Sequence, residues 1–150
     1  MAKAATQSFA QMVLEVEFTT GTWSKVCGLI DVTITRTANV DTTETPDCAD
    51  ETLPLYVERE VRSLEVTVSA SGTWALASHE KMMDWWYSGT TLPVRLTNDK
   101  VVADGATGDT TIEQGPALLT TLTNTRTKGQ KVSAEVEMQF NGLPTRTAKT

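Results

Sequence analysis

The chain has 150 residues, a formal net charge of −6 and a pI near 4.8. This length suits one domain with a buried core, and the acidic balance excludes the basic stripe that phosphate-gripping nucleic-acid binders need. No apolar run approaches the roughly 18 residues of a membrane-spanning helix. Two cysteines, Cys27 and Cys48, are too few for a disulfide framework or a zinc site, and free thiols are favoured over one bridge between them.

The N-terminal third begins with a polar arm, residues 1–10, which lacks the apolar core of a secretory signal. Residues 11–18, "QMVLEVEF", then alternate apolar and acidic side chains, as a strand with one buried face does. The turn "TTGTW" predicts a hairpin into a second strand. Residues 29–37, "LIDVTITRT", alternate again and predict another strand.

A long polar stretch follows at 37–55, "TANVDTTETPDCADETLPL". It is acidic, contains two prolines and has almost no apolar anchors. The composition predicts a long loop, and a loop of this length inside a compact domain is usually functional or disordered. A second polar stretch, residues 98–115, is rich in Gly and Asp and is predicted to be a loop containing a short hairpin.

Four further strands are predicted, with the clearest alternation in "KVSAEVEMQF". Their ranges are 61–70, 92–96, 117–125 and 131–140. Such alternation suits antiparallel sheets with one buried face rather than a parallel core. We therefore expect a single domain, residues 1–150, that is mainly β: an antiparallel β-sandwich or barrel with one flanking α-helix.

The helix is predicted in "SGTWALASHEKMMDWWYSG", starting near Ser78, or a turn earlier at Thr73, and ending at Gly89. A projection at about 100° per residue places one apolar face toward the core: Leu76, His79, Met82, Met83, Trp86 and Tyr87. Trp85 falls on the other side. Two interpretations of Trp85 stay open: a partly buried surface tryptophan, or the anchor of a subunit contact, because exposed aromatics are enriched in protein interfaces.

Residues that carry chemistry are scarce. His79 is the only histidine, and its place on the apolar helix face predicts a packed, hydrogen-bonded side chain rather than a catalytic one. The segment "DGATGDTT" lacks the terminal glutamate of a calcium loop. We therefore expect no enzyme, no catalytic residue, no metal site and no cofactor.

The order of strand, helix and strand in "REVRSLEVTVSASGTWA", "SHEKMMDWWYSG" and "TTLPVRLTN" resembles the tail tube (major tail) proteins of long-tailed phages. It is most similar to the branch that includes gene transfer agents, and "VCGLIDVTITRTANVDTTET" resembles that family's second strand and long loop. The resemblance implies a structural virion protein that assembles into six-membered rings stacked into a hollow tube, with neighbouring sheets joined into one barrel around the lumen.

The resemblance also implies partners and a location. These are other copies of the chain, a tape-measure protein in the lumen, tail terminator and distal tail proteins, and double-stranded DNA that passes during ejection without specific binding, with no membrane. The protein would be in the virion tail after assembly in the host cytoplasm. The long loop 37–55 would reach neighbouring subunits, which makes its residues interface candidates: Asp47, Cys48, Pro54 and Leu55.

Acidic residues on the strands are the candidates for the lumen wall: Glu15, Glu17, Glu65, Glu135 and Glu137. The outer surface of the tube is the alternative place for them, because the sequence does not show which strand faces point inward. DNA carries about one negative charge per ~1.7 Å, so such a wall would repel it. Two alternatives remain open. One is a stand-alone β-sandwich that binds a glycan or host surface, with Trp85, Trp86 and Tyr87 as a stacking platform. The other is a ring-forming tail terminator or baseplate protein of the same fold.

Overall fold

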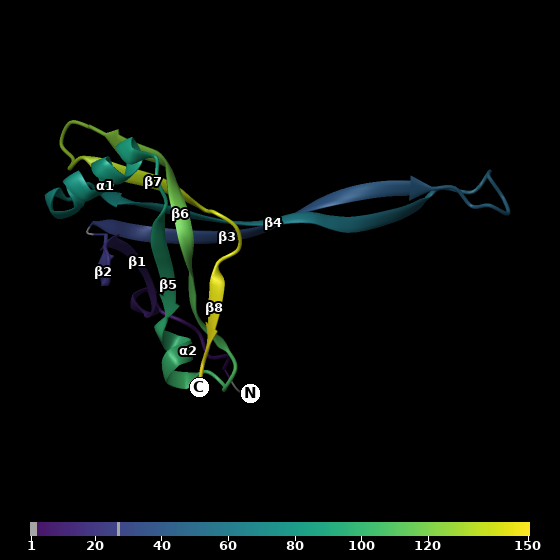
Figure 1. Ribbon diagram of the computed structural model, residues 1–150, viewed down its shortest axis with the longest axis horizontal. Helices are drawn as coiled ribbons and strands as arrows, with labels where there is room; N and C mark the ends of the chain where they lie inside the picture. Colours follow the sequence, from purple (N-terminus) through teal and green to yellow (C-terminus); the bar gives the residue numbers. More distant parts are fainter. Residues whose placement is uncertain (1–2, 27) are drawn as a thin grey trace.

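The computed structural model describes residues 3–26 and 28–150, as a layered β body from which one long hairpin projects (Figure 1). The strands are β1 (Met12–Thr19), β2 (Thr22–Lys25), β3 (Leu29–Thr45), β4 (Tyr56–Thr73), β5 (Leu92–Asn98), β6 (Thr110–Thr125), β7 (Ser133–Phe140) and β8 (Thr145–Ala148). The helical segments are η1 (Phe9–Gln11, a 3₁₀ turn), α1 (Leu76–Ser88) and α2 (Asp99–Asp104). No described helix has both the length and the apolar character needed to cross a bilayer.

The strands form one antiparallel sheet in the order β2-β1-β5-β6-β7-β4-β3, with β8 paired to β6. Strand β6 pairs with β5 over 112–117 and with β7 over 117–125, so it passes from one layer to the other. The two layers face each other across the core, and Arg36 of β3 forms an ion pair with Glu113 of β6. The predicted mainly-β antiparallel fold is confirmed.

The core follows from the predicted alternation. The buried residues include Leu14 and Val16 of β1, Val94 of β5 and Val136 of β7, which one layer presents to the other. The hairpin predicted at "TTGTW" joins β1 to β2. Period-two patterning therefore located most strands and their buried faces, because each strand covers one side with apolar side chains.

Helix α1 corrects the predicted helix face. The residues it buries are Ser78, Met82 and Trp85, whereas Trp86 is 45% exposed, Tyr87 73% and Leu76 86%. His79 and Met83 are only half-buried, so of the predicted core face only Met82 is fully in the core. The helix has two apolar sides, and a projection cannot tell which side meets the sheet.

Trp85 is a core residue and not an exposed anchor, with only 2% of its surface accessible. Its indole Nε1 donates a hydrogen bond to the carbonyl oxygen of Thr90 at 3.0 Å. Its ring meets the ring of Phe18 edge-on, with centroids 6.2 Å apart. A buried indole needs such a partner for its N–H. The subunit-contact role proposed for Trp85 rested on exposure, and the structure contradicts that exposure.

The two predicted loops are also corrected. Residues 37–45 belong to β3 and pair with residues 56–65 of β4, so only 46–55 connects the strands. Residues 98–115 contain α2 and the start of β6 rather than a hairpin. Asn98 stabilises the start of α2 as its N-cap, because its side-chain oxygen accepts a hydrogen bond from the backbone N–H of Val101. As predicted, α1 ends at Gly89, which adopts φ of 65°.

Candidate assembly surfaces

The first surface is a polar wall on the outer face of the β6-β7-β4-β3 layer. Three of the predicted lumen residues lie on this face: Glu65 of β4, and Glu135 and Glu137 of β7. Asp31 of β3 adds a fourth carboxylate. The remaining side chains on the wall are mostly hydroxyls: Thr33, Thr35, Thr37, Thr67, Ser69, Ser71, Thr121 and Thr123. A shallow hollow crosses it, lined by Asp31, Glu135 and Glu137 among these hydroxyls.

The carboxylates of the wall are separated by hydroxyl side chains. Glu137 lies opposite Ser69 on one neighbouring strand and Thr121 on the other, and Glu135 lies between Ser71 and Thr123. This spacing avoids the destabilising placement of like charges directly opposite one another. The wall is therefore wettable and negative, and its negative charge is compatible with a stable sheet.

Glu15 and Glu17 lie elsewhere, on β1 in the other layer. Glu15 accepts a hydrogen bond from Arg95 at 3.1 Å, and the Arg95 guanidinium lies 4.4 Å from the Trp23 ring centroid. Glu17 accepts a hydrogen bond from the Gly21 backbone in the β1–β2 turn. The five predicted wall residues therefore separate into two surfaces, and a lumen wall can include only one of them.

The second feature is a pair of free strand edges on the same layer. Strand β3 is the last in the sheet order and has β4 as its single strand partner among the described residues. At the other side, residues 118–125 of β6 pair with β7, whereas β5 and β8 pair only with earlier parts of β6. Unpaired backbone N–H and C=O groups therefore line both sides of the wall.

The third surface is the projecting arm, which we define as residues 38–64 of the β3–β4 hairpin (Figure 1). None of its described residues is buried. One side continues the core face and is partly apolar: Ala38, Val40, Val57, Val61 and Leu64. The other side continues the polar wall: Asn39, Asp41, Thr43, Glu58, Glu60 and Ser63. The arm is thus an amphipathic ribbon whose apolar side lies in solvent.

A β-bulge maintains this sidedness. Asn39 pairs with Ser63 but Val40 pairs with Val61, so Arg62 is the extra residue. In a regular ladder without a bulge, Val40 would pair with Arg62, and Val61 would point to the polar side. The reason is that a shift of one residue moves every following side chain to the other face. The bulge therefore keeps Val57 and Val61 on the side of Leu64.

The tip of the arm contains the predicted interface candidates Asp47, Cys48, Pro54 and Leu55. Cys48 is a free, exposed thiol, and Cys27 lies outside the described residues. Asp47 organises the turn: its Oδ1 accepts hydrogen bonds from the backbones of Ala49 and Asp50 at 2.8 and 3.3 Å. These bonds, with one from Tyr56, hold the pKa of Asp47 below its ordinary value. Pro54 and Leu55 are exposed.

The fourth surface is the outward stripe of α1, defined as Leu76, Met83, Trp86 and Tyr87. The rings of Trp86 and Tyr87 meet edge-on with centroids 5.1 Å apart and are both solvent-exposed. His79 lies beside the stripe, and its Nδ1 accepts a hydrogen bond from Trp74 at 2.9 Å, as expected for a packed histidine. Because Trp85 is buried, the three neighbouring aromatics do not form one stacking platform.

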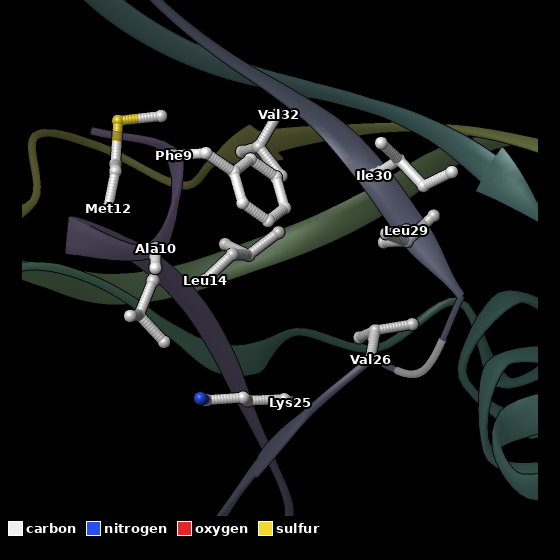
Figure 2. Close-up of a pocket in the computed structure, with 10 residues that line it drawn as sticks. Phe9, Ala10, Met12, Leu14, Lys25, Val26, Leu29, Ile30 and Val32 are labelled. Atoms are coloured by element: carbon white, nitrogen blue, oxygen red, sulfur yellow. The ribbon is translucent and has the colours of Figure 1, made fainter.

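The fifth surface is the seam groove, an apolar channel between β1 with η1 and the start of β3 (Figure 2). Its lining includes Phe9, Met12, Leu14, Leu29, Ile30 and Val32, with Lys25 at the rim. Figure 2 shows the Phe9 ring between Leu14 and Val32. Phe9 is 75% and Ile30 55% exposed, so the sandwich is incompletely covered along this seam.

Two of these surfaces had no counterpart in the sequence analysis. The apolar side of the arm was missed because the register of β3 and β4 depends on a bulge that composition does not reveal. The seam groove was missed because Phe9 belongs to a segment predicted as a polar arm. Within the described residues, no three His, Cys, Asp or Glu side chains gather as metal ligands.

Comparisons with known proteins complete these observations. The phage tail tube protein family model matches residues 6–146, and curated protein sequences gave no match. The tail of an empty gene transfer agent (GTA) particle, with C6 symmetry, gives a TM-score of 0.72 at 17% identity, covering 95% of this chain and 100% of that chain. A native GTA virion gives 0.69 at 16% identity with the same coverage. The SPP1 tail tube gives 0.66 at 9% identity, covering 95% of this chain and 80% of that chain.

Proposed function

The chain belongs to the phage tail tube protein family, and we propose that it assembles into stacked hexameric rings that form the hollow tail tube of a virion. The observation that carries this proposal is the β6-β7-β4-β3 layer, with its acidic, hydroxyl-rich face and its two free edges. Such a layer becomes a closed wall only when identical copies add their strands to it. The family resemblance of the strand–helix–strand order is confirmed by the match.

The two free edges are compatible with pairing between neighbours. Strands β3 and β6 run in opposite directions within the sheet, so β3 of one copy beside 118–125 of the next continues the antiparallel order. A head-to-tail contact of this kind closes into a ring, and closure removes both edges. The C6 symmetry of the GTA tail supports six copies in the ring.

In this ring the polar wall lines the lumen, with Asp31, Glu65, Glu135 and Glu137 facing the axis. Each copy adds its formal charge of −6, so the tube as a whole is acidic. A negative, hydrated wall repels the DNA backbone, which carries about one charge per ~1.7 Å. The tube would therefore let DNA pass during ejection without binding it, and a tape-measure protein would occupy the lumen before that.

The arm is the element suited to contacts between copies. A two-stranded ribbon is at best marginally stable alone in water. Residues 3–26 and 28–150 leave the valines and the leucine of this ribbon exposed, so another molecule is needed to cover them. Contacts of the arm with adjacent subunits would join the rings into a tube in the host cytoplasm. Tail terminator and distal tail proteins would meet the same surfaces at the two ends of the tube.

Negative-stain imaging of the purified chain tests the assembly. We expect rings with sixfold symmetry and, at higher concentration, hollow tubes of uniform diameter. A protein that remains monomeric at high concentration, and also in the presence of preformed tube ends, would contradict the proposal. Rings that never stack would point instead to a terminator or baseplate role.

The charge of the lumen wall is tested by Glu135→Lys. We expect tubes of this variant to retain added double-stranded DNA at low salt and to release it as salt rises, because six new cations face the axis in each ring. The matched control is Asp99→Lys, which changes the net charge equally but lies on α2, away from the wall. Equal DNA retention by both variants in a co-sedimentation assay would contradict the assignment of this face to the lumen.

A further inference from the structure

The outward stripe of α1 is an apolar surface that the described part of the chain leaves largely uncovered. Leu76, Trp86 and Tyr87 are all exposed, although the helix already buries Met82 and Trp85 on its other side. An exposed patch of aromatic and aliphatic side chains is more typical of an interface than of a free surface. The occupant of this stripe can be identified from the position of α1 in the sheet.

Helix α1 packs against β6, the strand that carries one of the two free edges. It lies on the core side of the layer, since Met82 and Trp85 belong to the core cluster. The seam groove lies beside β3, the strand with the other free edge, and it opens on the same side, since Leu29 and Val32 contact that core. Helix α1 begins on the β3 side of this face, where Ala75 adjoins Gly28. Leu76 therefore lies near the groove of its own chain, whereas Trp86 and Tyr87 lie toward the other end of the helix.

We propose that the outward stripe of α1, centred on Trp86 and Tyr87, packs into the seam groove of the next copy in the ring. The inference rests on the proposed ring, because edge pairing of β6 with the next β3 brings α1 beside the neighbouring groove. Six identical contacts then cover both apolar surfaces at once. The contact is heterologous and closes with the ring, as a head-to-tail interface must.

Size and charge support this pairing. The groove has a volume of about 230 Å³, larger than the roughly 150 Å³ cavity that can hold a benzene ring, so it can accept an aromatic side chain. Lys25 lies at the rim of the groove, and the exposed Glu80 and Asp84 lie on α1 next to the stripe. Opposite charges around an apolar centre resemble the polar rim of an interface.

Disulfide cross-linking in assembled tubes tests the contact directly. In a background with Cys27→Ser and Cys48→Ser, we would combine Tyr87→Cys with Ile30→Cys in one chain. Oxidation should then give a ladder of linked subunits up to the hexamer on a non-reducing gel. The control combines Tyr87→Cys with Val57→Cys, which places the second thiol on the arm and tests whether the stripe meets an arm instead.

The possible results distinguish a failure of the proposed contact between α1 and the groove from a failure of the proposed tube assembly. A ladder with Ile30→Cys and not with Val57→Cys supports the proposal. Tubes without that ladder, or a ladder only with Val57→Cys, overturn it and leave the tube assignment standing. Failure of the unsubstituted chain to form any ring overturns both.

A double-mutant cycle gives a second measurement that needs no cross-link. Tyr87→Ala and Phe9→Ala change exposed side chains, so the thermal unfolding temperature of the monomer should stay nearly unchanged. Each should raise the concentration needed for ring assembly about tenfold. If the two side chains meet, the double variant should be little worse than either single variant. Fully additive effects, or no effect on assembly, would overturn the proposed contact.

Discussion

The two halves of the β3–β4 hairpin are built differently, although they belong to the same two strands. In the body, Val66 and Val68 of β4 are buried against the opposite layer. In the arm, Val57 and Val61 occupy equivalent alternating positions on the same side but remain about half exposed. The alternation of apolar side chains in β4 thus continues from the body into the arm, where these side chains are no longer buried.

This difference separates folding from assembly. The body has its own core, so its stability comes from burial within one chain. The arm has backbone pairing, but none of the residues that the structure describes covers its apolar side, so within a single chain that side contributes little to stability. Its apolar residues gain their stabilisation only when another molecule covers them, and changes in the arm should therefore affect tubes more than monomers.

Removal of the arm should have the largest effect. Residues 40–62 can be replaced by Asn-Gly, which joins Asn39 to its partner Ser63 through a two-residue hairpin turn. We expect a folded monomer with a thermal unfolding temperature close to that of the intact chain, and no tubes in electron micrographs. Normal tubes from the shortened chain would show that the arm is not needed for assembly.

The reverse case is a change in the core of the body. Trp85→Ala removes a buried indole, so we expect the free energy of unfolding to fall by about 3–5 kcal/mol. Trp86→Ala, one residue along the same helix, should cost less than about 1 kcal/mol, because that side chain is partly exposed. Urea unfolding of the two monomers measures both. Similar losses for the two variants would contradict the assignment of Trp85 to the core and Trp86 to the surface.

The same contrast explains which features could be predicted from the sequence. Alternation at 11–18 and 131–140 identified strands correctly because those strands bury one face in their own chain. Residues 37–45 were predicted as a loop because they contain threonines and acids without a run of buried positions. Their strand conformation depends on pairing with β4, which local patterning does not reveal.

The prediction of the buried face of α1 was wrong for a related physical reason. Leu76, Met83, Trp86 and Tyr87 form an apolar side, as predicted, but Trp85 with Met82 forms a second one that meets the sheet. A periodicity argument finds apolar sides without ranking them, because burial depends on what each side faces. Here the Trp85 ring packs against Phe18, and its N–H donates a hydrogen bond to the Thr90 carbonyl. Neither contact could be predicted from the helix alone.

Single substitutions on the two sides of the arm should affect tube assembly less than removal of the arm does, and they test whether only the apolar side contributes to assembly. Val61→Asn places an amide on the apolar side, whereas Glu60→Gln places an amide on the opposite side, which is already polar. Both residues are exposed, so neither variant should change monomer stability by more than about 0.5 kcal/mol. We expect Val61→Asn to raise the concentration needed for tube assembly about tenfold and Glu60→Gln to leave it nearly unchanged. Equal effects would show that the two sides are not functionally distinct.

The smallest effect concerns the tip, whose local order comes from its own residues. Backbone hydrogen bonds from Ala49 and Asp50 lower the pKa of Asp47 below its ordinary value of 3.8. Because the pKa is lowered in the folded chain, the stabilisation is fully present above pH 3.8 and is lost as the pH falls through the lowered value. The body should remain folded through this change, since Asp47 contacts only the tip.

An acid titration of the unassembled chain, followed through the amide chemical shifts of Ala49 and Asp50, measures this loss. We expect a midpoint below pH 3.8 and no change in the core amides over the same range. Asp47→Asn is the matched control, because it keeps an acceptor oxygen but cannot titrate. Its tip amides should respond only to Asp50, whose own pKa is lowered by hydrogen bonds from Thr52. A midpoint at or above 3.8 for Asp47 would show that its carboxylate does not hold the turn, and the hydrogen bonds of Asp50 with Thr52 would then be what orders the tip.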